Sequence, residues 1–496
     1  MVSLRGSSDT RAIVCILTDK FKVSNNWVSH LSLATTTILG VAGFIFALKD
    51  GRFRNLKLFS ASEKDDAFLV PGLQNLGNNC FLNVILQALA SCKDFRSFLE
   101  WVIEDARDTV TGEMDQHFPL TFALSALLQE LCTVGRRRSV SNPREVMLAL
   151  TDYARNFNLT SQQDAAEALL HLISSLQQEI VFCYRPLQSS NLSDILFSRN
   201  LRMLAPSEGL HGLMELKRWH KHLRGPFDGI LGSTLMCRTC SSQISLEFQF
   251  FHTLPLSPLL HSGGSNIMFG CTLENCLKKF LDTEKVENFF CHRCWHGAAL
   301  KYLSVIGAPE VTDIEKLRNC GGDDQCDCKT SHFLERMPWS NSYSHILKQL
   351  IISRFPKLLC IQVQRASFNM YGESYKLTGH IAFPLVLDLS LFAPSPIGLN
   401  KVEGIQMSSK YQKAEASRNS DNLYRLVTVV EHFGITGSGH YTVYRSVRVA
   451  SQEEEEEEEE ECEELRWFSI SDSEVSRVSE SDVLGAEASL LFYERV

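Results

Sequence analysis

Outside one short segment, the sequence lacks any excess of charge of one sign. The chain of 496 residues has a formal net charge of −9, but residues 453–464 contain eleven glutamates interrupted only by Cys462. Without these eleven, 49 basic residues face 47 of the 58 acidic ones, so the remainder is near neutral. Bulk charge therefore gives no support to nucleic-acid binding. The hydrophobic share of 44% is typical of a chain with a core, which excludes an intrinsically disordered protein.

We also expect no cleavable signal peptide, because the first apolar stretch begins far into the chain and no small-residue cleavage site follows it. Residues 31–48 are mostly apolar, small or hydroxylic. A stretch of that length can cross the roughly 30 Å of hydrocarbon in a bilayer. We therefore expect a membrane anchor at residues 27–48, in contact with the lipid bilayer. The basic residues between positions 49 and 57 favour a cytosolic location for the rest of the chain. The alternative is a buried or interfacial helix.

The chain has no internal repeat and no β-α-β alternation, which argues against a parallel α/β sheet. Helical periodicity dominates its first half. Short strands are expected in the second half, at residues 358–364, 425–431, 441–446 and 490–493. The fold class is therefore predicted to be α+β. The glutamate run, within residues 451–464, is typical of a solvated insertion.

The densest motif surrounds Cys80. A Gly-Asn-Asn turn at residues 77–79 precedes it, and apolar residues follow it at helical spacing: Leu82, Ile85, Leu86 and Leu89. Cys80 is therefore expected to begin a helix, where the dipole and the free backbone N–H groups would stabilise a thiolate. Asn75, five residues earlier, could donate an amide N–H to a developing oxyanion. The alternative is a small, buried structural cysteine.

A histidine far along the chain could serve as the base for this thiol. Glycines stand at positions 434, 437 and 439, and His440 then opens an alternating run that is typical of a strand. Such an imidazole can present one ring nitrogen to a thiol and the other to an orienting group. Ser471 and Asp472 follow a further apolar strand and supply polar groups.

Four of the sixteen cysteines stand as two Cys-x-x-Cys pairs, Cys237/Cys240 and Cys291/Cys294. Two such pairs offer four thiolates for a tetrahedral structural zinc, and they favour a metal site over a disulfide framework. The long spacing suggests that the metal would join the ends of two hairpins. The alternative is a metal-free chance arrangement.

The segments around Cys80 and His440 together resemble the two catalytic boxes of the ubiquitin-specific proteases, a family of papain-like cysteine peptidases. Residues 162–167, Gln-Gln-Asp-Ala-Ala-Glu, resemble a third motif of that family, where Ser161 and Asp164 can cap a helix. The resemblance implies a papain-like fold with fingers, palm and thumb subdomains. It also implies a thiol-dependent hydrolase that cuts the isopeptide bond at the C-terminal glycine of ubiquitin.

The resemblance assigns roles to single residues. Cys80 would be the nucleophile, His440 the general base and then acid, and Asn75 the oxyanion donor. Ser471 stands where the family usually has aspartate or asparagine. Its hydroxyl can fix the imidazole but carries no negative charge, so Asp472 remains an alternative orienting group. The four cysteines would hold a structural zinc at the tip of the fingers, and no catalytic cofactor is expected.

An anchored catalytic domain with serine in the third position resembles a family member of the mitochondrial outer membrane. This implies a single-pass protein whose catalytic domain faces the cytosol, and whose partners are ubiquitin and ubiquitinated membrane proteins. Its activity there would oppose mitophagy. The alternatives are an inactive ubiquitin-binding tether or a peptidase for another ubiquitin-like modifier. The expected organisation is a tail at 1–26, the anchor at 27–48, a basic linker at 49–67 and a catalytic domain at 68–496, with fingers within about 230–300 and the acidic insertion at 451–464.

Overall fold

The structure is a computed structural model, and its contacts divide the chain into two units, Met1–Ala67 and Phe68–Val496. The described residues are 69–109, 117–135, 137–155, 157, 161–183, 225–261, 264, 266–289, 291–306, 315, 317, 320, 344–392, 422–450 and 463–496. The predicted tail, anchor and linker, and most of the acidic insertion, therefore lie outside them. Within the described part of the chain, no helix has both the length and the apolar character needed to cross a membrane.

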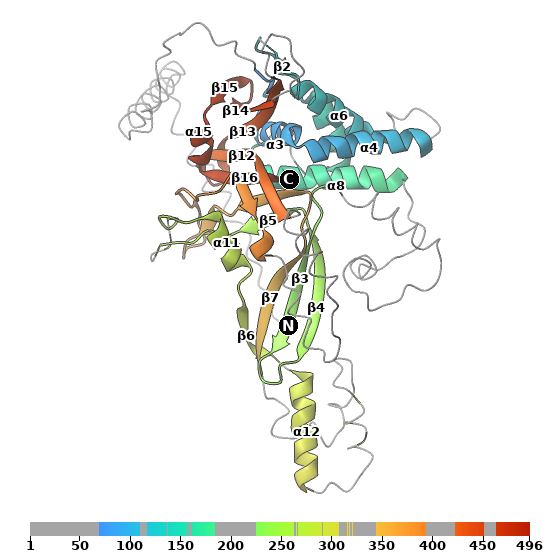
Figure 1. The fold of residues 1–496 in the computed structure, drawn as a ribbon, viewed down its shortest axis with the longest axis vertical. Helices are drawn as coiled ribbons and strands as arrows, with labels where there is room; N and C mark the ends of the chain where they lie inside the picture. Colours follow the sequence, from blue (N-terminus) through green and yellow to red (C-terminus); the bar gives the residue numbers. More distant parts are fainter. Residues whose placement is uncertain are drawn as a thin grey trace, which may run out of the picture. The chain divides into compact units, whose positions relative to one another are not determined.

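A group of helices forms one side of the second unit, the thumb (Figure 1). The sequence explains where two of them begin. Pro119 occupies the first turn of α6, where its missing N–H costs nothing. Asp164 accepts the backbone N–H groups of Ala166 and Glu167 and so caps α8, as predicted. The helices are α3 (Cys80–Ser91), α4 (Lys93–Thr109), α6 (Pro119–Leu131), α7 (Arg144–Tyr153) and α8 (Ala165–Cys183).

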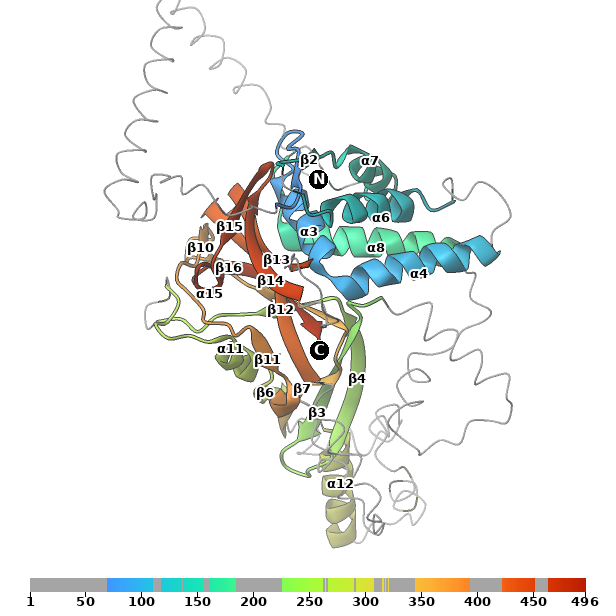
Figure 2. The ribbon, with the colours of Figure 1, turned by 45° about the horizontal axis from the view of Figure 1, so that its top comes forward.

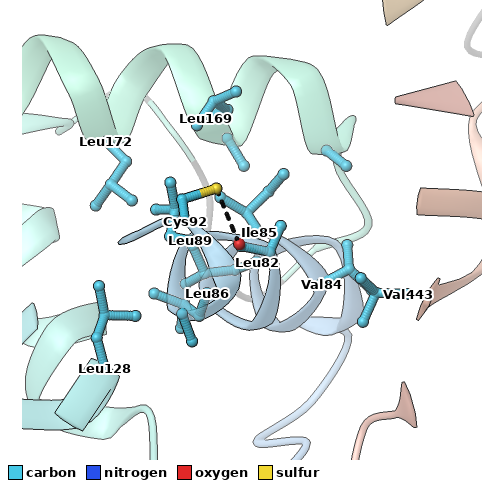
Figure 3. Close-up of a cluster of buried hydrophobic side chains, with 14 of the residues drawn as sticks. Leu82, Val84, Ile85, Leu86, Leu89, Cys92, Leu128, Leu169, Leu172 and Val443 are labelled. Carbon is cyan, nitrogen blue, oxygen red and sulfur yellow. Dashed lines mark hydrogen bonds between the residues drawn. The ribbon is translucent and has the colours of Figure 1, made fainter. Parts of the chain in front are cut away.

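Helix α3 lies at the centre of the unit and is buried from Cys80 to Ala90. Figure 3 shows its leucines packed against Leu169 and Leu172 of α8 and against Leu128 of α6. Val84 of α3 faces Val443 of the neighbouring sheet. A helix that is covered on every face cannot rotate or slide without opening cavities, so the position of its first residue is fixed by packing.

A buried carboxylate ties three of the thumb helices together. Glu179 of α8, 1% exposed, accepts the backbone N–H groups of Leu120 and Thr121 at the start of α6. It also accepts the hydroxyl groups of Thr121 and Tyr153. The free N–H groups and the positive end of the helix dipole thus supply the partners that a buried carboxylate requires.

The palm is an eight-stranded sheet with the strand order β15-β14-β13-β12-β16-β8-β5, and β11 pairs with β12 beside this path. All neighbours are antiparallel except β5 and β8. The four predicted strands are confirmed as parts of β8, β12, β13 and β16. The strands are β5 (Thr253–Leu256), β8 (Leu358–Val363), β11 (Val386–Asp388), β12 (Leu423–Ile435), β13 (Ser438–Ala450), β14 (Glu463–Ser471), β15 (Glu474–Val478) and β16 (Ala488–Arg495).

Arg445 joins the sheet to the helices. Its guanidinium, on β13, is 1% exposed and donates to Gln87 and Ser91 of α3 and to the carbonyl oxygen of Leu131 at the end of α6. Since a buried cation without these acceptors would be costly, the three hydrogen bonds fix the register between α3 and β13. Burial lowers the pKa of Arg445 to about 10.

A second sheet forms the fingers, with the strand order β4-β3-β7-β6. It extends beyond the predicted boundary near residue 300, because its third strand comes from residues 344–354. Helix α12 follows at the far end of this sheet (Figure 1). The elements are β3 (Gly229–Cys237), β4 (Gln243–Phe251), β6 (Glu284–Phe289), β7 (Ser344–Arg354) and α12 (His292–Ile306). The helix α11 (Leu273–Phe280) packs against β5 of the palm.

Short elements complete the described unit. Gly72 approaches Ser473 so closely that an added Cβ would lie 2.7 Å from its carbonyl oxygen, so no larger residue fits there. This contact holds the segment before α3 against the turn between β14 and β15. The short elements are β1 (Gly72–Leu73), β2 (Val140–Ser141), β9 (Ala366–Phe368), β10 (Ser374–Lys376), η2 (Ser390–Phe392) and α15 (Glu480–Leu484).

Candidate functional site

Cys80 is the first residue of α3, as the motif predicts, and is only 4% exposed. The turn before it passes through left-handed backbone at Gly77 (φ 112°) and Asn78 (φ 59°), conformations that glycine and asparagine tolerate best. Burial raises the pKa of the Cys80 thiol, and the charge of Asp472 raises it further. The backbone N–H groups of Tyr441, Phe81 and Cys80 act in the opposite direction without reversing the shift.

The expectation of a thiolate stabilised by the start of the helix therefore does not describe the resting site. Removal of water from around the sulfur outweighs the N–H groups at the helix start, so the thiol keeps its proton at neutral pH. A base is needed to make it nucleophilic.

His440 and Ser471 lie at the same end of the palm sheet. His440 is near the start of β13 and Ser471 is the last residue of β14, the adjacent antiparallel strand. The His440 Nε2 and Ser471 Oγ atoms are 2.8 Å apart. When Nε2 carries the proton and donates it to this hydroxyl, Nδ1 is left as the basic nitrogen. Helix α3 packs beside β13 in both views (Figures 1 and 2).

Asp472 makes other contacts, with two side-chain amides. Its Oδ2 atom accepts from Asn75 Nδ2 at 2.8 Å, and its Oδ1 atom accepts from Asn83 Nδ2 at 2.7 Å. The Asp472 carbonyl oxygen also accepts the backbone N–H of Leu73. Asp472 lies in the turn between β14 and β15 with a positive φ of 50°. Among the described contacts, Ser471 is thus the partner of the imidazole and Asp472 the partner of Asn75.

Asn75 is exposed and sits in the loop before Cys80. One N–H of its amide is given to Asp472, and its Oδ1 atom accepts the backbone N–H of Gly77 at 3.0 Å. Because an amide carries two N–H groups, these contacts leave the second one unused.

A cleft of about 540 Å³ opens beside Cys80. Its walls come from the start of α8, the strands β8 and β10 and the β12–β13 hairpin. Gln162, which precedes α8, exchanges two 3.3 Å hydrogen bonds with the backbone of Gly439 and so links the thumb to the hairpin that carries His440. Besides Cys80, the polar side chains that line the cleft are Gln162, Gln163, Asp164, Gln362, Gln364, Arg365, Lys376, His432, Thr436, Ser438, Tyr441 and Ser489.

Sequence reasoning missed several of these groups. It assigned Gln162 and Asp164 to a family motif without placing them at the cleft, and it gave no role to Arg365, Lys376 or Asn83. A signal for Asn83 was present, because Asn79, Asn83 and Gln87 recur every fourth residue on a helix that is otherwise apolar. Buried amides at such spacing need partners on one face.

The four predicted zinc ligands meet at the end of the fingers. Their sulfur atoms all lie within 4.8 Å of one another, and the Cys237–Cys294 and Cys240–Cys291 pairs have Sγ–Sγ distances of 3.6 and 3.7 Å. A tetrahedron with 2.3 Å Zn–S bonds has sulfur atoms about 3.8 Å apart, whereas a disulfide needs about 2.05 Å. The four cysteines could therefore bind a structural zinc.

The spacing suggested that both cysteine pairs lie at the ends of hairpins, but only one pair does. Cys237 and Cys240 lie at the turn between β3 and β4, whereas Cys291 precedes α12 and Cys294 lies in its first turn. A metal held here would fix the start of α12 to the end of the β3–β4 hairpin.

Comparisons with known proteins agree on one family. The family model described as "Ubiquitin carboxyl-terminal hydrolase" matches residues 71–493. Ubiquitin carboxyl-terminal hydrolase 27 of Arabidopsis thaliana is 81% identical over 100% of both chains. Ubiquitin carboxyl-terminal hydrolase 30 of Homo sapiens is 26% identical and covers 96% of this chain and 92% of its own length.

Among solved structures, the SAGA DUB module containing Ubp8 and bound to monoubiquitin has a TM-score of 0.51 at 20% identity, covering 90% of this chain and 74% of that one. This likeness supports the papain-like α+β fold of the catalytic domain.

These comparisons correct the predicted location. The placement as a single-pass protein of the mitochondrial outer membrane was carried over from a family member of that membrane. The plant relative, at 81% identity against 26% for hydrolase 30, overturns it. The inferred role against mitophagy rested on the same placement and is withdrawn with it.

The family model spans most of the chain and a full-length relative is 81% identical. The protein therefore belongs to the ubiquitin carboxyl-terminal hydrolase family and is a cysteine-type deubiquitinase.

Proposed function

We propose that Cys80, His440, Ser471 and Asn75 are the groups with which this deubiquitinase cuts the isopeptide bond after the C-terminal glycine of ubiquitin. The observation that carries the proposal is the 2.8 Å contact between His440 Nε2 and Ser471 Oγ. His440 belongs to β13, the strand against which α3 packs. The backbone of Tyr441, next to His440, reaches the Cys80 thiol. Nucleophile, base and orienting group thus come from three elements that share one packed junction.

The first half of the reaction transfers the acyl group to the enzyme. Nδ1 of His440 takes the proton of the Cys80 thiol, and the sulfur attacks the carbonyl carbon of the ubiquitin glycine. The resulting oxyanion is held by the free N–H of Asn75 and by backbone N–H groups at the start of α3. His440 then gives its proton to the departing lysine amine, and a thioester with Cys80 remains.

The second half restores the enzyme. His440 takes a proton from water, the hydroxide attacks the thioester carbonyl, and the Cys80 sulfur leaves and is reprotonated. Ubiquitin is released with a free C-terminal carboxylate. Each half passes through its own tetrahedral intermediate, but in both the negative charge develops on the same glycine carbonyl oxygen, so one set of donors serves twice.

Ser471 fixes the imidazole without adding charge. Its hydroxyl accepts the Nε2 proton and so keeps the tautomer in which Nδ1 is basic. A carboxylate in this place would also stabilise the imidazolium, and the serine gives up that contribution. Two amides occupy the carboxylate of Asp472. We therefore assign it to holding Asn75.

The first test removes the sulfur nucleophile. Cys80→Ala should abolish both cleavage of a fluorogenic ubiquitin amide and labelling by a ubiquitin probe with a C-terminal electrophile, while thermal unfolding stays cooperative. Cys92→Ala, a buried thiol just beyond the other end of the same helix, is the matched control and should still be labelled. Labelling that persists in Cys80→Ala would refute the assignment.

The same assay separates the rival functions. Absence of turnover by the wild-type protein together with ubiquitin binding would identify an inactive tether. Faster cleavage of another ubiquitin-like modifier than of ubiquitin would identify a different peptidase.

The second test distinguishes Ser471 from Asp472. Ser471→Ala should lower kcat by about tenfold or more, because the imidazole loses its fixed tautomer. Ser471→Asp should move the ascending limb of the pH–rate profile to higher pH, because a neighbouring carboxylate favours the imidazolium and raises its pKa. Asp472→Asn should lower kcat and leave that limb in place. The assignment fails if Asp472→Asn moves the limb and Ser471→Ala leaves the rate unchanged.

The third test concerns the four cysteines of the fingers. We expect about one zinc per protein by atomic emission, and its loss in Cys240→Ser, because three thiolates hold zinc more weakly than four. Loss of the metal should lower the unfolding temperature and raise KM for ubiquitin substrates more than it lowers kcat, because the site lies in the fingers and not beside Cys80. Protein that is purified without zinc and is as stable as zinc-loaded protein would contradict this.

A further inference from the structure

Three side-chain amides follow one another along α3 and the residue before it, at Asn79, Asn83 and Gln87. They are 0%, 1% and 1% exposed, respectively, on a helix that is otherwise surrounded by apolar side chains. A buried amide without partners costs more than it contributes, so each must be matched by specific groups. Asn79 and Asn83 are connected by hydrogen bonds to Asp472, whereas Gln87 bonds to Pro71 and Arg445.

The hydrogen bonds of Gln87 go to groups that do not contact Asp472. Its Nε2 atom donates to the carbonyl oxygen of Pro71, and its Oε1 atom accepts from Arg445. Asn83 instead reaches across 389 residues of sequence to the turn after β14, where its Nδ2 atom donates to Asp472 Oδ1 at 2.7 Å. The same carboxylate accepts from Asn75 through its other oxygen at 2.8 Å.

Asn79 determines which way the Asn83 amide faces. Its Nδ2 atom donates to Asn83 Oδ1 at 3.0 Å, while its own Oδ1 atom accepts the backbone N–H of Leu76 at 2.7 Å. The Asp472 carboxylate can only accept, so a flipped Asn83 would place its carbonyl oxygen against a negative charge. The donor from Asn79 therefore favours the orientation in which Asn83 presents its N–H groups to Asp472.

The chain of contacts Asn79–Asn83–Asp472–Asn75, which we call the amide relay, ends beside Cys80. With Asp472 held by Asn83 on one oxygen, its second oxygen is aligned on Asn75. Asn75 is itself exposed, and apart from Asp472 its side chain is held by the backbone N–H of Gly77, which donates to its Oδ1 atom at 3.0 Å. An oxyanion donor contributes only when it is already oriented as the charge develops.

We propose that Asn79 and Asn83 are positioning residues of the deubiquitinase reaction, which act through Asp472 to hold the free N–H of Asn75 toward the oxyanion. This inference rests on the proposed role of Asn75. It adds two residues that touch neither the substrate nor the reacting sulfur, and it gives Asn79, which precedes the nucleophile, a function beyond starting the helix.

The test is a double-mutant cycle in the full-length protein, measured as kcat and KM for a fluorogenic ubiquitin amide. Asn75→Ala should lower kcat by roughly 10²- to 10³-fold, as loss of an oxyanion donor does. Asn83→Ala should lower kcat by about tenfold and leave KM within about twofold. In the Asn75→Ala background, Asn83→Ala should have no further effect on kcat, because the group on which it acts is gone.

Two further variants test whether the loss of kcat is specific to the relay, one by rescue and one as a control. Asn79→Ala should lower kcat in the same Asn75-dependent way. Asn79→Thr should recover most of it, because a hydroxyl can still donate to Asn83. Tyr153→Phe is the matched control, since it removes one hydrogen bond to buried Glu179 within the helices and lies outside the relay. It should leave kcat unchanged in both backgrounds.

Three outcomes would overturn the inference. If Asn83→Ala lowers kcat equally with and without Asn75, its role is structural only. If neither Asn79→Ala nor Asn83→Ala changes kcat in protein that unfolds cooperatively, the relay has no role in the reaction. An unchanged kcat in Asn75→Ala would refute the oxyanion role of Asn75 and the relay together. Loss of activity in Cys80→Ala would still stand, so the deubiquitinase function itself would not be affected.

Discussion

The site depends on the packing of α3 against β13. The helix is buried from Cys80 to Ala90, and Arg445 of β13 donates to both Gln87 and Ser91. This contact fixes where the helix begins, and therefore where Cys80 lies relative to the hairpin that carries His440. The close approach of Gly72 to Ser473 fixes the segment before the helix in the same frame. The packed core thus places the backbone elements of the site, and the hydrogen bonds of Ser471 and Asp472 orient the side chains of His440 and Asn75 within it.

The proposed reaction depends on few charged side chains. Burial keeps the Cys80 thiol protonated at rest, the partner of His440 is a neutral hydroxyl, and the carboxylate of Asp472 is bound by two amides. Such a site relies on oriented hydrogen bonds more than on a preformed ion pair. Orientation in turn requires the rigid surroundings that the buried helix and sheet supply.

The sequence was sufficient for the α+β class, the palm strands, the helix at Cys80 and the grouping of four cysteines, because each follows from local periodicity or from a short motif. It could not show that Asp472 bonds to Asn75 and Asn83, since these contacts join residues 389 and 397 positions apart. Nor could it show the raised pKa of Cys80, because burial is a property of the assembled core. The location failed for another reason, as it was taken from one relative and not from the physics of the chain.

The central claim is that the resting thiol of Cys80 is protonated and depends on a base. Its most direct test is the rate of alkylation of Cys80 by iodoacetamide as a function of pH, with Cys80→Ala as background. A pKa raised above the ordinary thiol value of 9.0 keeps the proton on sulfur to higher pH, so the rate should be slow at pH 7 and still rise above pH 9. A rate that is already level below pH 7 would mean a thiolate at rest and would contradict the account.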